Sequence, residues 1–119
     1  MKQIYIQIPA YRDTELGPTL LDLIEKADDP DNLRIGVLWQ RAEGDKLPDE
    51  LRNNPNVEID EHPYQESRGC NWARAELQKR WRGEPYTLFL DSHHRFIPAW
   101  DRQLIAMHTS LKQIGRAHV

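Results

Sequence analysis

The sequence contains a single cysteine, Cys70, and no long apolar run. One cysteine excludes an internal disulfide framework and favours a reducing compartment. No apolar stretch approaches the length of a membrane-spanning helix, and the first residues lack the pattern of a secretory signal peptide. We therefore expect a cytoplasmic protein that does not associate with membranes.

An excess of basic residues is also missing. The 16 Lys and Arg residues are outnumbered by 19 Asp and Glu residues, which leaves a formal net charge of -3. Broad binding to nucleic acid or to an anionic membrane requires a basic face, so we expect neither as a partner. A length of 119 residues, of which 39% are hydrophobic, predicts one globular domain over residues 1–119.

Strand-like and helix-like segments alternate along the chain. Hydrophobic periodicity predicts strands at 4–8, 33–40, 57–60 and 86–90, and helices at 14–27, 70–81 and 100–114. Pro9 is expected to end the first strand because it lacks a backbone N–H. The apolar run 86–90 is typical of a central strand buried on both faces. The sequence therefore predicts an α/β fold, an open and mostly parallel sheet with helices on both faces.

Several single residues are interpreted from their type. Large aromatic side chains mostly fill protein interiors, so we assign all four tryptophans to the core: Trp39, Trp72, Trp81 and Trp100. Cys70 is interpreted as a small packed side chain, since no neighbouring motif predicts a lowered thiol pKa. The remaining histidines show no ligand spacing and are interpreted as structural or exposed: His62, His108 and His118.

Ligands of open parallel sheets bind beyond the carboxyl ends of the strands, which selects the polar segments 9–13, 40–45 and 91–95. In Asp91-Ser92-His93-His94-Arg95, continued strand geometry would place Asp91 and His93 on one side and turn His94 away. A carboxylate and an imidazole together suit Mn²⁺ or a similar ion, which would neutralise a diphosphate as it departs. The same pattern is also typical of a polar loop whose histidines only form hydrogen bonds, so both interpretations remain open.

Two further segments are candidates for binding a nucleotide. Gly69 precedes a predicted helix whose N-terminal N–H groups suit an anion, and Arg74 lies one turn into that helix. The alternative is an ordinary capped helix with a solvated Arg74. After the first strand, Tyr11 suits stacking on a base and Arg12 suits a phosphate or a base edge, although such loops also occur without a ligand.

These segments, taken in order, resemble one known family. The quoted motifs are Ile-Pro-Ala-Tyr-Arg-Asp-Thr-Glu-Leu (8–16), Arg-Ile-Gly-Val-Leu-Trp-Gln (34–40), Gly-Cys-Asn-Trp-Ala-Arg-Ala (69–75), Gly-Glu-Pro-Tyr (83–86), Asp-Ser-His-His-Arg-Phe (91–96) and Trp-Asp (100–101). They resemble the GlcNAc-transferases of glycosyltransferase family 60, which include a cytoplasmic enzyme that modifies hydroxyproline on a ubiquitin-ligase subunit. The resemblance covers nearly the whole chain.

The resemblance implies the nucleotide-sugar-binding half of a Rossmann-like GT-A fold, UDP-GlcNAc as donor, Mn²⁺ or Mg²⁺, and retention of anomeric configuration. Residue by residue, it implies that Asp91 and His93 bind the metal and that Asp91 also lies near the donor ribose. It implies that Arg74 faces the diphosphate or the sugar, and that Tyr11 and Arg12 border the uridine. It identifies neither a catalytic residue nor the acceptor.

GT-A enzymes are considerably longer than this chain, and the acceptor site and a further metal ligand normally come from their second half. We therefore expect donor binding without full catalysis. We also expect a homodimer, since an unpaired sheet edge and the apolar surface of the last helix would otherwise stay uncovered. One alternative is a non-catalytic nucleotide-sugar-binding or assembly module that requires a partner chain. A hydrolase using Asp91, His93 and His94 is less favoured, because the sequence shows no second cluster of ligands.

Overall fold

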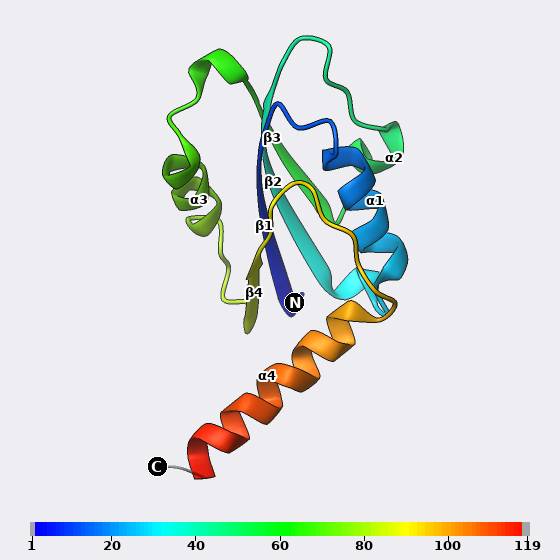
Figure 1. Cartoon of the computed structure of the whole chain (residues 1–119), viewed down its shortest axis with the longest axis vertical. Helices are drawn as coiled ribbons and strands as arrows, with labels where there is room; N and C mark the ends of the chain where they lie inside the picture. Colours follow the sequence, from blue (N-terminus) through cyan, green and yellow to red (C-terminus); the bar gives the residue numbers. More distant parts are fainter. Residues whose placement is uncertain (1, 118–119) are drawn as a thin grey trace.

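A computed structural model describes residues 2–117, with side chains up to residue 108. Strands and helices alternate along this chain (Figure 1). The strands are β1 (Ile4–Tyr11), β2 (Leu33–Arg41), β3 (Val57–Pro63) and β4 (Tyr86–Phe89). The helices are α1 (Leu16–Lys26), α2 (Asp49–Arg52), α3 (Cys70–Gln78) and α4 (Trp100–Ala117), with short 3-10 turns η1 (Pro30–Asn32) and η2 (Tyr64–Glu66). His118 lies outside the described residues.

The four strands form one parallel sheet in the order β3-β2-β1-β4. Ile4 at the start of β1 pairs with Leu33 on one side and with Tyr86 on the other. The chain winds from β1 to β2 and β3 in one direction and then crosses back to place β4 on the opposite side of β1. The winding direction therefore switches between β1 and β4, and the predicted parallel α/β fold is confirmed.

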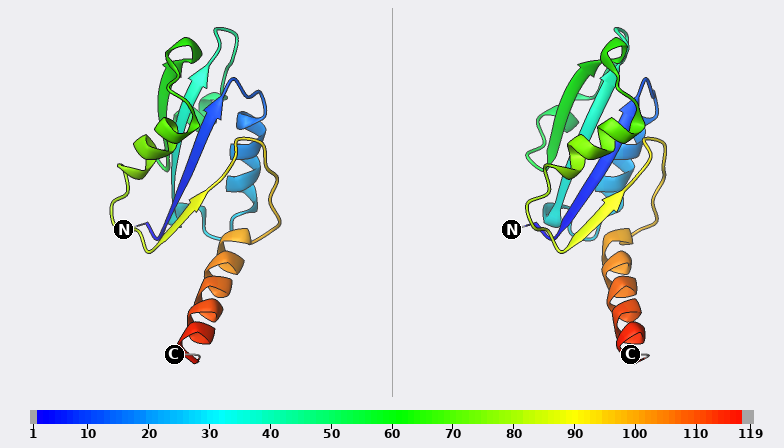
Figure 2. Two further views of the ribbon diagram at one scale, coloured as in Figure 1. Left: turned by 60° about the vertical axis from the view of Figure 1, so that its left-hand side comes forward. Right: turned by 90° about the vertical axis from the view of Figure 1, so that its left-hand side faces the viewer.

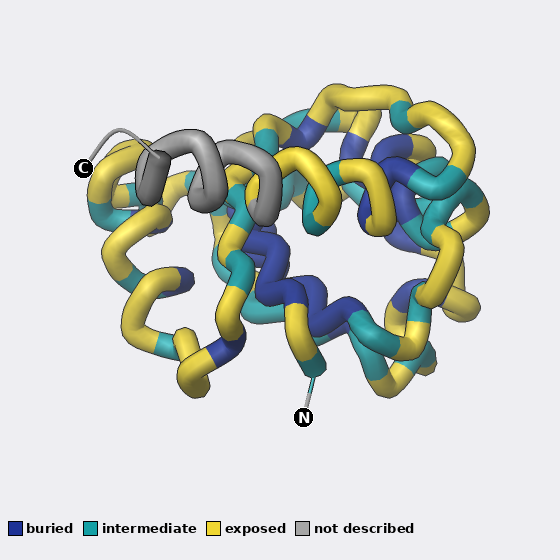
Figure 3. The backbone as a smooth tube through the Cα atoms, turned by 90° about the horizontal axis from the view of Figure 1, so that it is seen from below, coloured by how far each residue is buried: buried dark blue, intermediate teal, exposed yellow. Residues whose placement is uncertain are grey.

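Helices cover both faces of the sheet, with α1 and α2 on one face and α3 on the other (Figures 1 and 2). We call these the α1 face and the α3 face. Alternate residues of β1 explain the larger core, since Ile4, Ile6 and Ile8 are fully buried in the same cluster as Leu20 and Leu23 of α1. The buried segments of the backbone gather in the middle of the molecule (Figure 3).

Pro9 ends pairing with one neighbouring strand only, so the prediction that β1 stops there is wrong. β1 continues to Tyr11, where Arg12 N–H donates to the Gln40 carbonyl (2.8 Å). The alternate carbonyls of Gln3 and Gln7 face β4 instead and accept from Tyr86 and Leu90. Because successive residues of a strand face opposite neighbours, the nitrogen of Pro9 also faces β4. An N–H at this position would have continued the hydrogen bonds between β1 and β4 beyond Leu90, and proline lacks it.

The prediction that residues 86–90 form a central strand is also wrong, because β4 is an edge strand of the described sheet. Its apolar side chains are shared between the two faces. Tyr86 and Leu88 pack against the main core, whereas Phe89 is 45% exposed. An apolar run alone does not distinguish a strand buried on both faces from one that is half covered. The expected homodimer stays a prediction.

The tryptophans and the last helix divide between core and surface. Trp39 and Trp100 are buried as expected and Trp72 is partly buried, whereas Trp81 is 49% exposed, which contradicts its assignment to the core. The indole N–H of Trp81 donates to the Glu84 carbonyl (2.9 Å), so the ring lies along a turn. Trp100 anchors the start of α4, which then extends away from the sheet (Figure 1). Within residues 2–117, no helix combines the length and apolar composition needed to cross a membrane.

Candidate functional site

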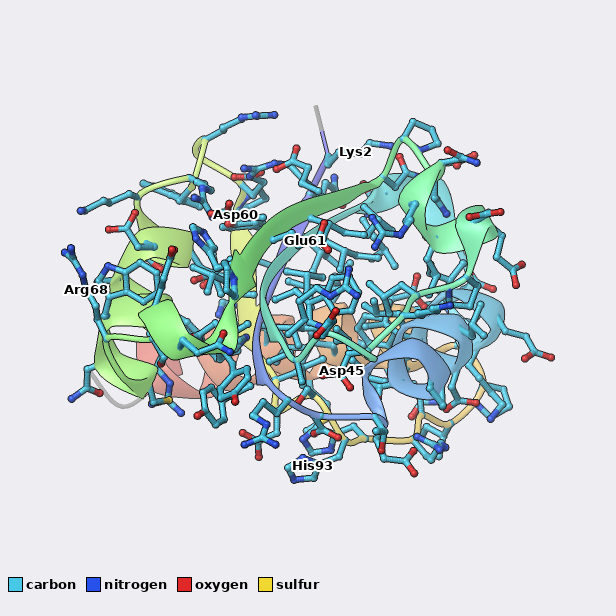
Figure 4. The ribbon with its side chains drawn as sticks, turned by 90° about the horizontal axis from the view of Figure 1, so that it is seen from above. Lys2, Asp45, Asp60, Glu61, Arg68 and His93 are labelled. Carbon is cyan, nitrogen blue, oxygen red and sulfur yellow. The ribbon has the colours of Figure 1, made fainter. Side chains whose placement is uncertain are left out.

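A pocket of about 470 Å³ opens at the carboxyl ends of the strands, on the side of β1 where the winding direction switches. The exits of β1 and β2, the segment leading into α3 and the segment after β4 all contribute to it. Its lining residues are Pro9, Tyr11, Asp13, Gln40, Ser67, Gly69, Cys70, Asp91, Ser92 and His93. Figure 4 looks onto this edge of the sheet and shows His93 at its rim.

Asp13 joins the exit of β1 to the segment after β4. Its Oδ2 accepts a hydrogen bond from the Ser92 hydroxyl (2.6 Å) and lies 3.1 Å from Nδ1 of His93. Its Oδ1 accepts from the backbone N–H of Glu15 (2.9 Å). Because Nδ1 of His93 faces this carboxylate, Nε2 is the ring nitrogen left for a ligand, and the His93 side chain is 64% exposed.

The hydrogen bonds to Asp13 favour its charged form. Burial by itself raises the pKa of this carboxyl, but the bonds from Ser92, Glu15 and His93 outweigh burial and hold the pKa below its usual range. Asp13 is therefore a carboxylate that orients a histidine ring through its Nδ1. A carboxylate in this position is the usual outer partner of a metal-binding histidine.

The segment that carries Asp91 and His93 is held along α1. The Thr19 hydroxyl is fully buried and makes two bonds to this segment: it donates to the Ser92 carbonyl (2.9 Å) and accepts from the His94 N–H (3.0 Å). Ser92 is itself buried. The backbone on both sides of His93 is thus fixed by one threonine of the helix.

Further contacts continue the same stripe of α1. Asp22 accepts from the Phe96 N–H, and Lys26 donates to the Phe96 carbonyl (3.1 Å) and pairs with Asp22 (2.8 Å). Glu15, just before the helix, pairs with Arg95 (2.7 Å). Positions 15, 19, 22 and 26 lie on one side of a helix, so a single polar stripe binds the loop at successive turns.

Asp91 lies between the pocket and a smaller crevice of about 230 Å³ that also includes Arg74 and His94. β4 ends at Phe89, so strand alternation does not extend to His94, and the expectation that His94 turns away from Asp91 is wrong. Nε2 of His94 lies 3.9 Å from Oδ2 of Asp91. Arg74 is exposed, and its guanidinium lies 6.0 Å from the centre of the Phe89 ring, on the same side of the sheet as Asp91.

Tyr11 and Arg12 occupy different places at the exit of β1. Tyr11 lines the pocket, is 52% exposed and contacts the ring of Tyr64 edge-on at 6.2 Å. Arg12 has a positive φ of 50° and places its guanidinium 4.4 Å from the centre of the Tyr64 ring. Tyr64 therefore braces both residues, but only Tyr11 is among those that line the pocket.

The start of α3 forms another wall of the pocket. Gly69 adopts a φ of +92°, which other residues rarely reach, and no side chain of the described residues caps the helix. Cys70, the first residue of the helix, is exposed and lines the pocket, so its interpretation as a packed side chain is wrong. An uncapped N-terminus with free N–H groups suits an anionic ligand.

Much of this site is predictable from the sequence, but the contacts between its segments are not. Tyr11, Asp91 and His93 line one pocket as the strand-exit rule predicts, and Arg74 lies in the adjoining crevice. Asp13 and Gln40 were missed, although both fall in the segments that this rule selected. Among the described residues, no three or more His, Cys, Asp and Glu side chains are grouped so as to hold a metal ion.

A family model described as Glycosyltransferase (GlcNAc) matches the chain in two overlapping segments, residues 3–54 and 46–117. Together these segments include every residue that lines the pocket and the crevice. Searches among curated proteins and among solved structures find no match.

Proposed function

Because the chain belongs to the Glycosyltransferase (GlcNAc) family, we propose that its pocket binds UDP-GlcNAc or a closely related UDP-sugar for transfer to a hydroxyl acceptor. The observation that carries the proposal is the convergence of Tyr11, Asp91 and His93 on one pocket at the switch point of a parallel sheet. We assign the sheet to the donor-binding half of a GT-A fold, with retention of anomeric configuration. The resemblance to glycosyltransferase family 60 extends this proposal to hydroxyproline as the acceptor.

A divalent cation, Mn²⁺ or Mg²⁺, fits the residues present. Asp91 offers an exposed carboxylate, and His93 offers Nε2 because its Nδ1 faces Asp13. These are donors that such ions accept, and donor oxygens and water would complete the coordination. When bound, the ion would neutralise charge on the donor diphosphate. Asp13 would hold the His93 ring in place, and Thr19 would hold the backbone around it.

Arg74 and the start of α3 would bind the phosphates. The guanidinium of Arg74 shares the crevice with Asp91, and the uncapped N-terminus of α3 lines the neighbouring pocket. Cationic and N–H donors on one side and a metal site on the other are suited to surround a diphosphate. Tyr11 would border the uridine, with Arg12 beside it.

The experiment is calorimetry with UDP and Mn²⁺ on the wild type and on Asp91→Ala, with Asp28→Ala as the matched control. Asp28 is an exposed aspartate after α1 and lines neither the pocket nor the crevice. We expect UDP to bind only with the cation, and we expect Asp91→Ala to lose this cation-dependent binding while Asp28→Ala keeps it. Arg74→Ala should weaken binding by about 1.5–3 kcal/mol with little change in stability.

Equal UDP affinity without the cation, or in Asp91→Ala, would overturn the metal assignment. Assays of sugar transfer and donor hydrolysis then separate the two functions considered above. Tight UDP-GlcNAc binding with no turnover on varied acceptors would favour a non-catalytic module that needs a partner chain. Light scattering at several protein concentrations tests the predicted homodimer.

A further inference from the structure

The turn that follows α3 presents a half-exposed tryptophan between two exposed cations. It consists of Lys-Arg-Trp-Arg at residues 79–82, and we call it the basic turn. Trp81 is 49% exposed, and the side chains of Lys79 and Arg82 are 71% and 67% exposed. Each of these two cations makes one ion pair at the surface, where such pairs contribute little, so both remain available to a partner. Tryptophan and arginine are the residues that most often dominate binding between proteins.

A depression of opposite character lies on the other face of the sheet, between α1 and α2. We call it the α1–α2 depression. Its volume is about 390 Å³, and its lining residues are Leu21, Ile24, Glu25, Glu50, Leu51 and Asn54. The three aliphatic residues belong to the main core or pack against it, so they form an apolar floor. The two glutamates are exposed and form no ion pair within the described part of the chain.

Helix stability does not explain the carboxylates at this end of α1. The carboxyl end of a helix carries partial negative charge, so acidic residues there are unfavourable. Glu25 is the next-to-last residue of α1, Asp28 and Asp29 follow the helix directly, and all three are exposed. The basic residue of the last turn, Lys26, is paired with Asp22 (2.8 Å). The resulting negative potential is suited to attract and orient a cationic partner surface.

We propose that the basic turn of one copy of this chain docks in the α1–α2 depression of a second copy. Trp81 packs against the aliphatic floor, while Lys79 and Arg82 pair with the two glutamates. A second copy is the partner because the chain itself carries both surfaces, which match in charge and in apolar content. No residue of either surface lines the pocket or the crevice, so the inference is independent of the proposed function.

This contact is head to tail, because α3 and the pair α1 and α2 lie on opposite faces of the sheet (Figure 2). It therefore differs from the closed homodimer expected from the sequence, in which one patch covers its own copy and association stops at two chains. A contact centred on one anchor side chain is small, so association is weak and increases with protein concentration. It also decreases with added salt, because charged groups at the rim contribute to it.

The test is sedimentation velocity of the chain at several protein and salt concentrations, with two variants that each break one surface. Trp81→Ser with Arg82→Ser breaks the basic turn, and Glu25→Lys with Glu50→Lys reverses the charge of the depression. Each variant alone should associate at least about 10-fold more weakly than the wild type. Mixed in equal amounts, the two variants should form a pair and nothing larger, because one keeps an intact depression and the other an intact basic turn.

The matched control is Glu43→Lys with Glu66→Lys, which changes the net charge as much as the depression variant does. Both glutamates are exposed and lie outside the two surfaces, so association should be unchanged. Thermal unfolding verifies that each variant is folded. If a double variant unfolds, Arg82→Ser and Glu25→Lys, both at exposed positions, are mixed in the same way.

Four results would overturn the head-to-tail contact. The wild type could stay monomeric up to its solubility limit, or association could survive in both surface variants. The control could lose association as much as the depression variant does, or the mixture could fail to associate where the wild type does. UDP binding should be the same in all these proteins, and its absence from all of them would contradict the proposed function without affecting this inference.

Discussion

The two faces of the sheet are packed by different means. On the α1 face, β1 contributes three fully buried isoleucines, Ile4, Ile6 and Ile8, to an apolar core. On the α3 face, the intervening residues Tyr5 and Gln7 are just as buried but polar. The first face is therefore stabilised mainly by burial of apolar area. The second combines a small apolar cluster, Leu38, Ala73 and Leu77, with hydrogen bonds and ion pairs of buried polar side chains.

Arg34 is the centre of the α3 face. Its guanidinium pairs with Glu84 (2.6 Å) and Glu58 (3.1 Å), donates to the Arg80 carbonyl and lies 4.1 Å from the centre of the Tyr5 ring. The Tyr5 hydroxyl in turn donates to the Leu77 carbonyl of α3 (2.7 Å). Directional contacts of this kind fix the orientation of α3, whose first residues form a wall of the pocket.

The largest loss of stability is expected when the buried ion pair of the α3 face is broken. Arg34→Met leaves Glu84, which is 3% exposed, without its cation and should destabilise the fold by about 3–5 kcal/mol. Arg34→Met combined with Glu84→Leu should recover most of that loss, since no buried charge then lacks a partner. Urea unfolding of the two variants measures both effects. A double variant as unstable as the single one would mean that packing, not charge, decides this face.

The same pair predicts a pH dependence. Burial tends to raise the pKa of Glu84, but hydrogen bonds from the Arg82 backbone and from Arg34 hold it below the ordinary value of 4.5. Stability from this group is therefore present above pH 4.5 and is lost as the pH falls through the lower folded-state value. The double variant should lose less stability over this acidic range than the wild type.

On the apolar α1 face, the expected loss of stability increases with the side-chain volume that is removed. Ile6→Ala should cost about 2–5 kcal/mol and Ile6→Val about 0.5–1.5 kcal/mol, because each deletion leaves a proportionate cavity. Neither variant should change the acid dependence described for Glu84. An equal loss for both variants in urea unfolding would contradict an apolar face governed by packing volume.

A smaller loss of stability is expected at Gly36, where the Tyr5 side chain lies against the backbone. A Cβ at Gly36 would lie 2.8 Å from the Tyr5 hydroxyl and 3.0 Å from its ring, and the hydroxyl is held by Leu77. Gly36→Ala should therefore cost about 1–3 kcal/mol through overpacking. Combining Gly36→Ala with Tyr5→Phe should reduce that cost, because the hydroxyl no longer crowds the new methyl group. Thermal unfolding of the single and double variants checks this.

The smallest loss of stability is expected at the polar stripe of α1, which is the polar part of an otherwise apolar face. Thr19→Val keeps the shape of the side chain but removes the hydroxyl that bonds to both Ser92 and His94. This loss should destabilise the fold by about 1–2 kcal/mol. It should also weaken cation-dependent UDP binding, because the segment around His93 is less firmly held. Thr14→Val, at an exposed threonine before the helix, is the control and should change neither quantity.

The sequence was sufficient to predict the parallel fold and the edge of the sheet at which the pocket lies, because both follow from local periodicity and chain topology. It was not sufficient for contacts between distant segments. Asp22 and Lys26 look like an ordinary solvated helix face, and only the folded chain brings Phe96 against them. Pro9 was expected to stop a strand, yet which neighbour loses a bond depends on which side its nitrogen faces.

The same limit applies within the site. Asp91 and His93 stand out as a motif because only Ser92 separates them in sequence, whereas Asp13 reaches His93 across 80 residues. Burial of Gln40 is foreseeable from the apolar strand around it, but only the folded chain shows that its Oε1 has no partner among the described residues. Chemistry that depends on one short segment was therefore visible, and chemistry that depends on pairing segments was not.

The bonds between α1 and the loop after β4 also have a consequence for local unfolding. The amides of His94 and Phe96 donate to side chains of the helix, so they become free for hydrogen exchange only when the loop separates from α1. Opening the loop breaks contacts at successive helical turns together, which makes the helix and the loop one cooperative unit. We expect both amides to exchange far more slowly than a surface loop would, and at rates that follow the amides in the middle of α1.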